Sequence, residues 1–190
     1  MVSATGTKDA WSLEGAASWA PGELDERLRR CVATGRLEGL ELEHWLGDGP
    51  PPPLRRYHHL RLVPGRDDGS VGQTDDREAA PDTIEFTHPR PEPGTLPSPL
   101  LRHRVEARPA DISAFAQALL DARAFDPTGG SAPRSPDALT LRIGAAEGGR
   151  RALATHHDPL PGRLSAVGRA AAELIERAVD EGTTDVVRLR

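Results

Sequence analysis

The feature that most constrains the fold of this chain is a two-residue alternation of apolar and polar side chains. In residues 40–46, three leucines and His44 alternate with Glu41, Glu43 and Trp45. Successive side chains of a β-strand point to opposite faces of a sheet, so this pattern predicts a strand with one buried face. The alternation recurs in five further segments, which are residues 57–63, 82–88, 100–107, 138–144 and 151–157.

A helical period appears in the rest of the chain. Residues 109–125 and 160–181 carry apolar side chains three and four residues apart, which predicts two helices, the second capped near Asp158. Residues 21–35 predict a short helix that ends at Gly35. Because the strands come in runs, we expect an α+β fold. It would be a mostly antiparallel sheet of four to six strands with two helices packed on one face, plus the short N-terminal helix.

We expect three parts in the 190-residue chain. They are a flexible N-terminal tail (1–20), the short helix (21–35) and a single α+β domain (36–190), with Pro/Gly-rich loops at 47–56, 64–82 and 89–99. The tail holds Trp11 and Trp19, whose large rings would anchor it either to its own domain or to a partner.

Composition argues against several classes of function. The net charge is −5 and no basic stripe is visible, so we expect no nucleic-acid partner. No apolar run approaches a membrane span and no secretory signal is visible, so we expect a cytoplasmic protein without a membrane partner. Arg replaces Lys almost everywhere, which suggests a GC-rich, bacterial genome. The single cysteine, Cys31, lies on the apolar stripe of its helix and is expected to be a buried thiol.

No sequence motif points to a specific chemistry. Walker, GxGxxG and GxSxG motifs are missing from the sequence, and we expect neither a catalytic residue nor a cofactor. The strand pattern does place His44, His58 and His103 on the same faces as the core leucines. Three imidazoles with an open fourth position can bind zinc, so these histidines are weak candidates for a metal site.

The most unusual stretch is HWLGDGPPPPLRRYHH, residues 44–59, which lies between two predicted strands. It predicts a hairpin with a long, stiff loop, because prolines favour extended geometry and cannot donate ladder hydrogen bonds. Aromatic and arginine side chains are enriched at binding hot spots. We therefore expect a protein-contact surface made by Trp45, Pro50, Pro51, Pro52, Pro53, Arg55, Arg56 and Tyr57. The alternative is a simple bend, with Trp45 packed under the N-terminal helix.

One block of the chain resembles a known family. ALLDARAFDP, the strand segment PDALTLRIGAAEGGRRALATHHD and a helix ending LIERAV are similar to emfourin-type inhibitors of thermolysin-like metalloproteases. Asp137, Leu139 and Leu141 fit the family's strand pattern, and Phe125 fits the end of its first helix. The resemblance covers residues 105–179 and implies the fold and, as a function, protease inhibition. It assigns no inhibitory residue, and the four-proline insertion departs from the family's glycine-rich turn.

These observations favour a non-enzymatic protein-binding module, acting as an inhibitor or accessory subunit through its Pro-rich loops. The partner would be a protein of unknown identity. Two alternatives stay open: a metal-dependent or small-molecule enzyme built on the histidine cluster, and a structural subunit of a larger assembly.

Overall fold

A computed structural model of the chain describes residues 17–20, 22–48, 57–65, 80–90, 99–126 and 139–187. Its elements follow one another as α1 (Glu23–Thr34), β1 (Glu41–Asp48), β2 (Tyr57–Val63), β3 (Thr83–Pro89), β4 (Leu100–Glu106), α2 (Pro109–Asp121), β5 (Leu139–Glu147), β6 (Arg150–His157), the 3₁₀ turn η1 (Gly162–Leu164), α3 (Ser165–Glu181) and β7 (Thr183–Val187).

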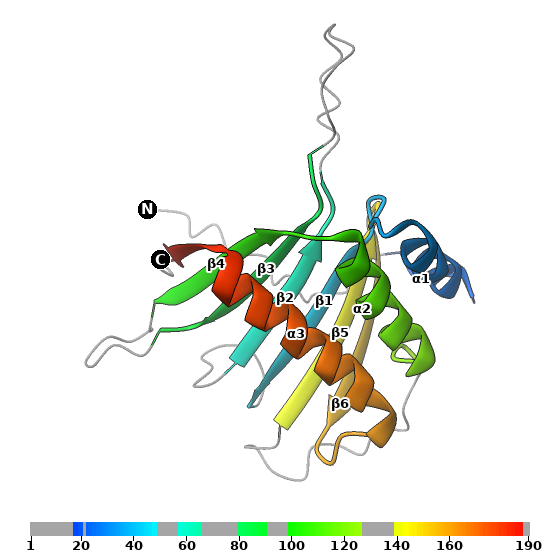
Figure 1. Ribbon diagram of the computed structural model, residues 1–190. Helices are drawn as coiled ribbons and strands as arrows, with labels where there is room; N and C mark the ends of the chain where they lie inside the picture. The colour runs from blue at the N-terminus through cyan, green and yellow to red at the C-terminus, as the bar shows by residue number, and fades with distance from the viewer. Residues whose placement is uncertain are drawn as a thin grey trace, which may run out of the picture.

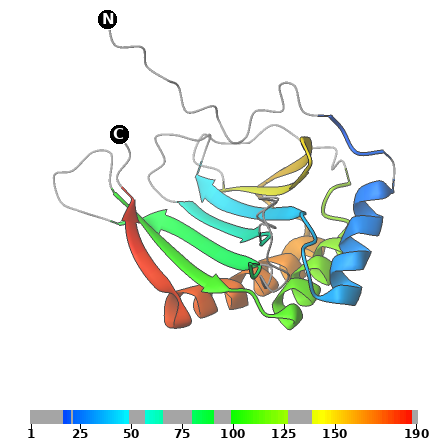
Figure 2. The ribbon, with the colours of Figure 1, turned by 90° about the horizontal axis from the view of Figure 1, so that it is seen from above.

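The strands form one antiparallel sheet in the order β6-β5-β1-β2-β3-β4-β7. Helices α2 and α3 lie across one face of this sheet, and α1 packs beside α2 near the β5–β6 hairpin (Figures 1 and 2). The expected α+β class with a mostly antiparallel sheet is therefore confirmed. The expected four to six strands are too few, because β7 adds a seventh strand next to β4. Four of its five side chains are exposed, so this edge strand lacks a clear alternation of apolar residues.

The alternation predicted in the sequence sets the faces of the central strands. Leu42 pairs with Leu62, and Leu62 pairs with Ile84, so their side chains form a row on the helix-covered face. These three side chains are fully buried, whereas Arg61 and Glu85 are partly exposed on the opposite face. Burial of the leucine rows against α2 and α3 supplies the main driving force for folding.

The helices agree with their predicted stripes but differ at their ends. All four stripe residues of α2 are buried, namely Ile112, Phe115, Ala116 and Leu119. Helix α2 ends at Asp121 rather than Phe125, because the chain turns and the Ala124 N–H donates to the Leu119 carbonyl at 3.0 Å. Helix α3 begins at Ser165 after η1, and Asp158 does not cap it.

Helix α1 ends at Gly35 as predicted, for two physical reasons. Gly35 has φ 65°, a left-handed conformation that favours glycine, and its N–H donates to the Cys31 carbonyl. A Cβ at this position would lie 2.5 Å from the Cβ of Pro109 at the start of α2. The glycine therefore allows α1 and α2 to approach closely, and Cys31 is buried between them as expected.

The part of the tail that the structure describes lies against the domain. The Arg151 N–H donates to the Ala17 carbonyl, and the Arg150 guanidinium lies 4.4 Å from the Trp19 ring centroid. Trp19 also packs against the hydrophobic core, which agrees with anchoring to its own domain. Trp11 and most of the three expected loops lie outside the described residues.

Candidate functional site

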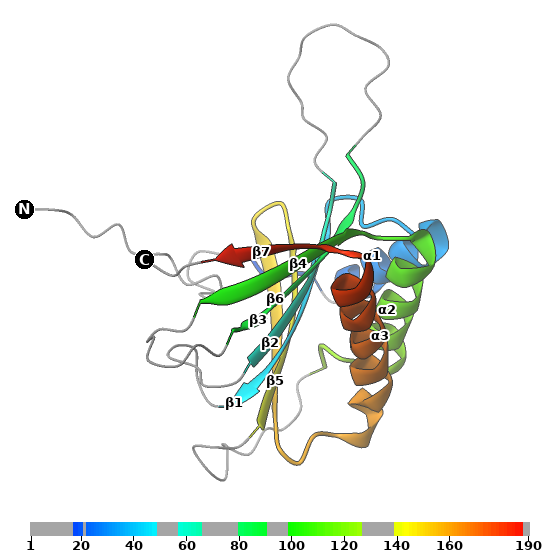
Figure 3. The same ribbon diagram turned by 60° about the vertical axis from the view of Figure 1, so that its left-hand side comes forward.

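The three segments that are richest in proline are all joined to strands at the same end of the sheet. Segments 49–56, 91–98 and 127–138 hold four, three and three prolines. Each segment begins or ends at this end of the sheet, which we call the loop end (lower side of the sheet in Figures 1 and 3). The segments themselves lie outside the described residues. The register pairs that define the loop end are Gly47↔Tyr57, Asp48↔Leu139, Pro89↔Leu100 and Leu100↔Val187.

Trp45, which we expected to form part of the contact surface, is a buried residue. Trp45 is only 2% exposed. It lies in the middle of β1, with His59 of β2 opposite it on one side and Arg142 of β5 on the other. The Arg142 guanidinium carbon is 5.1 Å from the Trp45 ring centroid, a cation–π distance. Trp45 is thus part of the folded scaffold on the face opposite α2 and α3.

The rest of the predicted contact surface is only partly visible. The backbone of Tyr57 pairs with Gly47, which confirms that β1 and β2 form a hairpin around the four prolines. Residues 50–53, Arg55, Arg56 and the side chain of Tyr57 lie outside the described residues. Their role in binding stays a prediction. The structure shows that the two strands flanking this segment, β1 and β2, meet at the loop end.

The three histidines predicted as weak metal candidates do not form one cluster. His44 is 5% exposed and lines a pocket under α3. His58 lines the same pocket, and both His58 and His103 pack against Phe86, with ring centroids 5.7 Å and 5.9 Å away. Across the described ranges, no group of three or more His, Cys, Asp or Glu side chains could hold a metal ion.

A histidine corner lies on the helix-covered face near the loop end, formed by His58, Phe86, His88 and His103. The Nε2 atoms of His88 and His103 are 3.2 Å apart, so one ring donates a hydrogen bond to the other. Only one of these two nitrogen atoms can carry a proton in that hydrogen bond. His103 Nδ1 is 3.1 Å from the Thr184 hydroxyl on β7. Burial, and then the neighbouring His88, lower the pKa of both His58 and His103.

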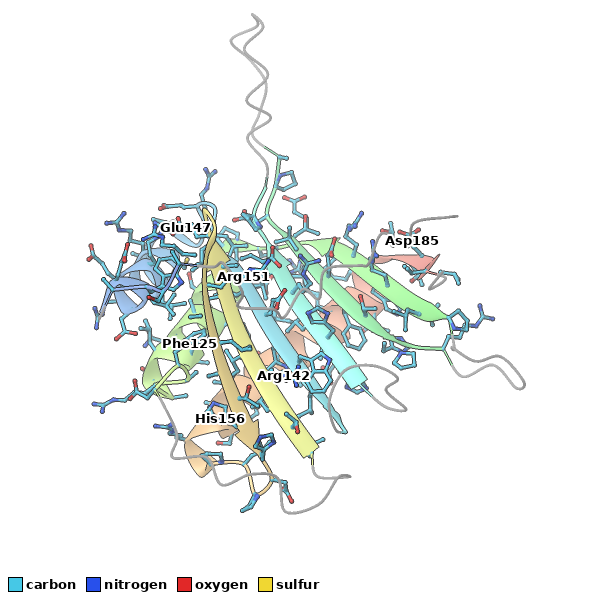
Figure 4. The ribbon with its side chains drawn as sticks, turned by 180° about the vertical axis from the view of Figure 1, so that it is seen from behind. Phe125, Arg142, Glu147, Arg151, His156 and Asp185 are labelled. Carbon is cyan, nitrogen blue, oxygen red and sulfur yellow. The ribbon has the colours of Figure 1, made fainter. Side chains whose placement is uncertain are left out.

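The opposite face of the sheet carries a charged network. Arg61 of β2 lies 2.6 Å from Glu41, 3.5 Å from Glu43 and 3.4 Å from Glu85. Arg104 extends the network through a 2.7 Å contact with Glu85. Arg142 and Arg151 reach the same face from β5 and β6 (Figure 4).

Glu43 has the most perturbed carboxyl group of this network. It leans over Gly144, where a Cβ would lie 3.2 Å from its Oε2 atom. Burial, and then the nearby Glu41 carboxyl, raise the pKa of Glu43 to about 7 against the opposing effects of Arg61 and Arg151. Burial also lowers the pKa of the adjacent His59 to about 4. A small pocket of about 200 Å³ adjoins both groups, so the arrangement offers a proton donor and an acceptor near neutral pH.

The sequence did not lead us to predict His88, Glu43 or Arg61 as candidate site residues. His88 continues the alternation of Ile84 and Phe86, so its place on the inner face could have been predicted. The polar alternation also placed Glu43 on the outer face. Its contact with Arg61 depends on the β1–β2 register, which the pattern of a single strand does not contain.

Cys31 is not a reactive thiol in this structure. Its Sγ lies 3.9 Å from the Leu37 carbonyl, and burial raises its pKa to about 11. A protonated, buried thiol is a poor nucleophile, so Cys31 acts in packing.

No described helix is long and apolar enough to cross a membrane. Comparison with known proteins gives no family for this chain: no family model matches it, and no curated protein matches it either.

Proposed function

We propose that this protein is a non-enzymatic protein-binding module that grips its partner at the loop end of the sheet. The observation that carries the proposal is that three Pro-rich segments enter or leave the sheet at the same end, next to the histidine corner. Loops that project from one end of a rigid sheet are a common way to build a contact surface.

The physical chemistry of this end favours binding of another protein. Proline-rich segments lose little conformational entropy when a partner holds them, so more of the contact energy remains as affinity. Arg55, Arg56 and Tyr57 add side chains of the types that dominate binding energy. On the folded sheet near the loop end, His58 of β2 is exposed and Val186 of the edge strand β7 is 50% exposed, so both side chains are accessible to a partner.

The resemblance of residues 105–179 to emfourin-type inhibitors suggests one concrete form of this function. In that form the partner is a thermolysin-like metalloprotease, and the module acts as its inhibitor. An accessory subunit of another enzyme would use the same surface without blocking a protease.

The test compares one loop variant with a matched control. Replacing Pro50–Pro53 by Gly-Ser-Gly-Ser changes the loop end, and the same replacement of residues 67–70 changes a segment that leaves the opposite end of the sheet. Affinity capture from the native host identifies the partner, and calorimetry with that purified partner gives the affinity of each variant. Inhibition of thermolysin is measured in parallel.

We expect the proline variant, and separately Arg55→Ala with Tyr57→Ala, to weaken binding at least tenfold, about 1.4 kcal/mol. The control replacement should bind like the wild type. Equal affinity of all variants would show that the loop end is not the contact surface. Binding without any effect on thermolysin would leave the accessory-subunit form of the proposal and exclude inhibition of that protease.

A further inference from the structure

The face of the sheet opposite α2 and α3, which we call the outer face, carries a tryptophan that is almost completely buried. Trp45 of β1 has the largest side chain among the described residues of this face, yet only 2% of the residue is exposed. The guanidinium of Arg142 lies over its ring. One arginine covers only one side of an indole ring, and the second face of an antiparallel sheet is open to water when nothing packs on it. Trp45 therefore needs a further cover.

No described helix or strand supplies this cover. Helices α2 and α3 lie behind the sheet when the outer face is viewed from the front, as in Figure 4, and α1 packs against α2. The burial is confined to part of the face. Glu43 of β1 and His59 of β2 keep only 15% and 19% of their side chains exposed. Arg104 of β4 keeps 45%, and Thr183 of β7 is exposed. The cover therefore lies over β5, β1 and β2.

The N-terminal tail joins the sheet on this side. Ala17 forms a parallel bridge with Arg150 at the start of the edge strand β6. The register places Trp45 level with Thr155, two strands away from β6 and five residues along it from Arg150. At strand spacings of about 4.8 Å and rises of about 3.4 Å, Trp45 is about 20 Å from Arg150. Residues 1–16 can extend to about 50 Å, so the tail is long enough to cross β5 and β1.

The Pro-rich segments are less suited to cover this region. Segment 49–56 joins Asp48 to Tyr57, and both ends are held at the loop end. Its contour is about 30 Å, so it reaches at most about 15 Å back along the sheet before it must return. Glu43 lies five residues from Asp48, about 17 Å away, which is beyond this reach. Segment 127–138 follows α2 and so begins on the helix-covered side.

The composition of the tail suits such a cover. Residues 1–16 include Val2, Trp11 and Leu13, with one lysine and two acidic side chains. A tryptophan ring buries a large apolar area when it packs on another aromatic ring. The arginine and glutamate side chains beneath are paired with one another, as in the Arg61–Glu41 contact, so the network does not require charges from the tail.

We propose that residues 1–16 lie across the outer face over β5, β1 and β2, with their apolar side chains against Trp45 and its neighbours. The tail would then be a strap that shields this face from solvent and from other molecules. The strap and the protein-contact surface at the loop end involve different parts of the sheet, so either proposal can fail without the other.

Acrylamide quenching of Trp45 fluorescence tests the strap in the full chain. Trp11→Phe with Trp19→Phe leaves Trp45 as the only tryptophan and keeps a ring at position 11. In this background, the tail variant has Ser at positions 2, 11 and 13, and the loop variant has Gly-Ser-Gly-Ser at positions 50–53. We expect the quenching constant to rise at least threefold in the tail variant and to stay unchanged in the loop variant.

Three results would overturn the proposal. An unchanged quenching constant in the tail variant would show that the tail does not cover Trp45. A rise in the loop variant alone would assign the cover to segment 49–56. A constant that depends on protein concentration would assign it to a second copy of the chain. Circular dichroism of each variant checks that the sheet is folded.

A second measurement leaves the tail intact. Trp19→Phe with Trp45→Phe makes Trp11 the only tryptophan, and its quenching constant should be at least threefold lower in the folded protein than in urea. Adding Leu153→Asp, on the outer face of β6, should remove this protection, whereas Thr183→Asp should not. Thr183 occupies the same row of paired residues at the far edge of the sheet. A Trp11 that is equally accessible in the folded and unfolded chain, or equal effects of the two Asp variants, would refute the strap.

Discussion

The raised pKa of Glu43 predicts an unusual dependence of stability on pH. The folded state keeps a proton on this carboxyl group up to about pH 7, whereas the ordinary pKa of a glutamate is 4.5. Between these two values the folded protein binds more protons than the unfolded chain. The contribution of Glu43 to the free energy of unfolding is therefore most favourable below pH 4.5 and is lost as the pH rises to about 7.

Glu43→Gln should remove this loss. The amide is neutral at every pH, is close to the protonated carboxyl in shape, and can donate a hydrogen bond to Glu41 as the protonated acid does. A pKa that rises from 4.5 to about 7 corresponds to about 3 kcal/mol, at about 1.4 kcal/mol for each pH unit. We therefore expect the variant to be about 2–3 kcal/mol more stable than the wild type at pH 8.

Urea unfolding, followed by circular dichroism at pH 5, 6, 7 and 8, measures the difference. At pH 5 the wild-type carboxyl is protonated in the folded state and only the unfolded chain has begun to lose this proton, so the two proteins should differ by only about 0.8 kcal/mol, and this comparison serves as the internal control. The gap should open between pH 5 and 7 and then stay constant. A variant that is equally stable or less stable than the wild type at pH 8 would refute the idea that burial makes charge on Glu43 costly.

The remaining predictions concern the scaffold. Leu119→Asp or Leu174→Asp should each cost several kcal/mol and abolish cooperative thermal unfolding, because both side chains are buried between helix and sheet; an unchanged melting temperature in both would contradict the architecture. Gly35→Ala should destabilise the protein by more than about 2 kcal/mol in urea unfolding, because it adds a clash with Pro109 to the strain of a left-handed residue. Gly148→Ala has similar backbone strain but open space around the Cβ, so it should cost only about 1 kcal/mol. Equal losses of stability in the two variants would show that the clash with Pro109 does not contribute to the loss.

Several features of the fold are local, and the sequence by itself determined them. A strand turns alternate side chains to opposite faces, so the pattern around Leu42 and Glu43 settles which of them faces the helices. The helical spacing of Ile112, Phe115 and Leu119 likewise marks the buried stripe of α2. Gly35 marks the end of α1 because few other residues adopt its conformation.

Only the tertiary structure decided which distant segments meet. The order β6-β5-β1-β2-β3-β4-β7 places β5 beside β1 and β7 beside β4, and these pairings depend on long-range register. That arrangement buries Trp45 between its neighbours, against the expectation from its polar face, and brings His88 to His103. It also sets the pKa of Glu43, because desolvation depends on all the surrounding elements together, which the pattern of one segment does not contain.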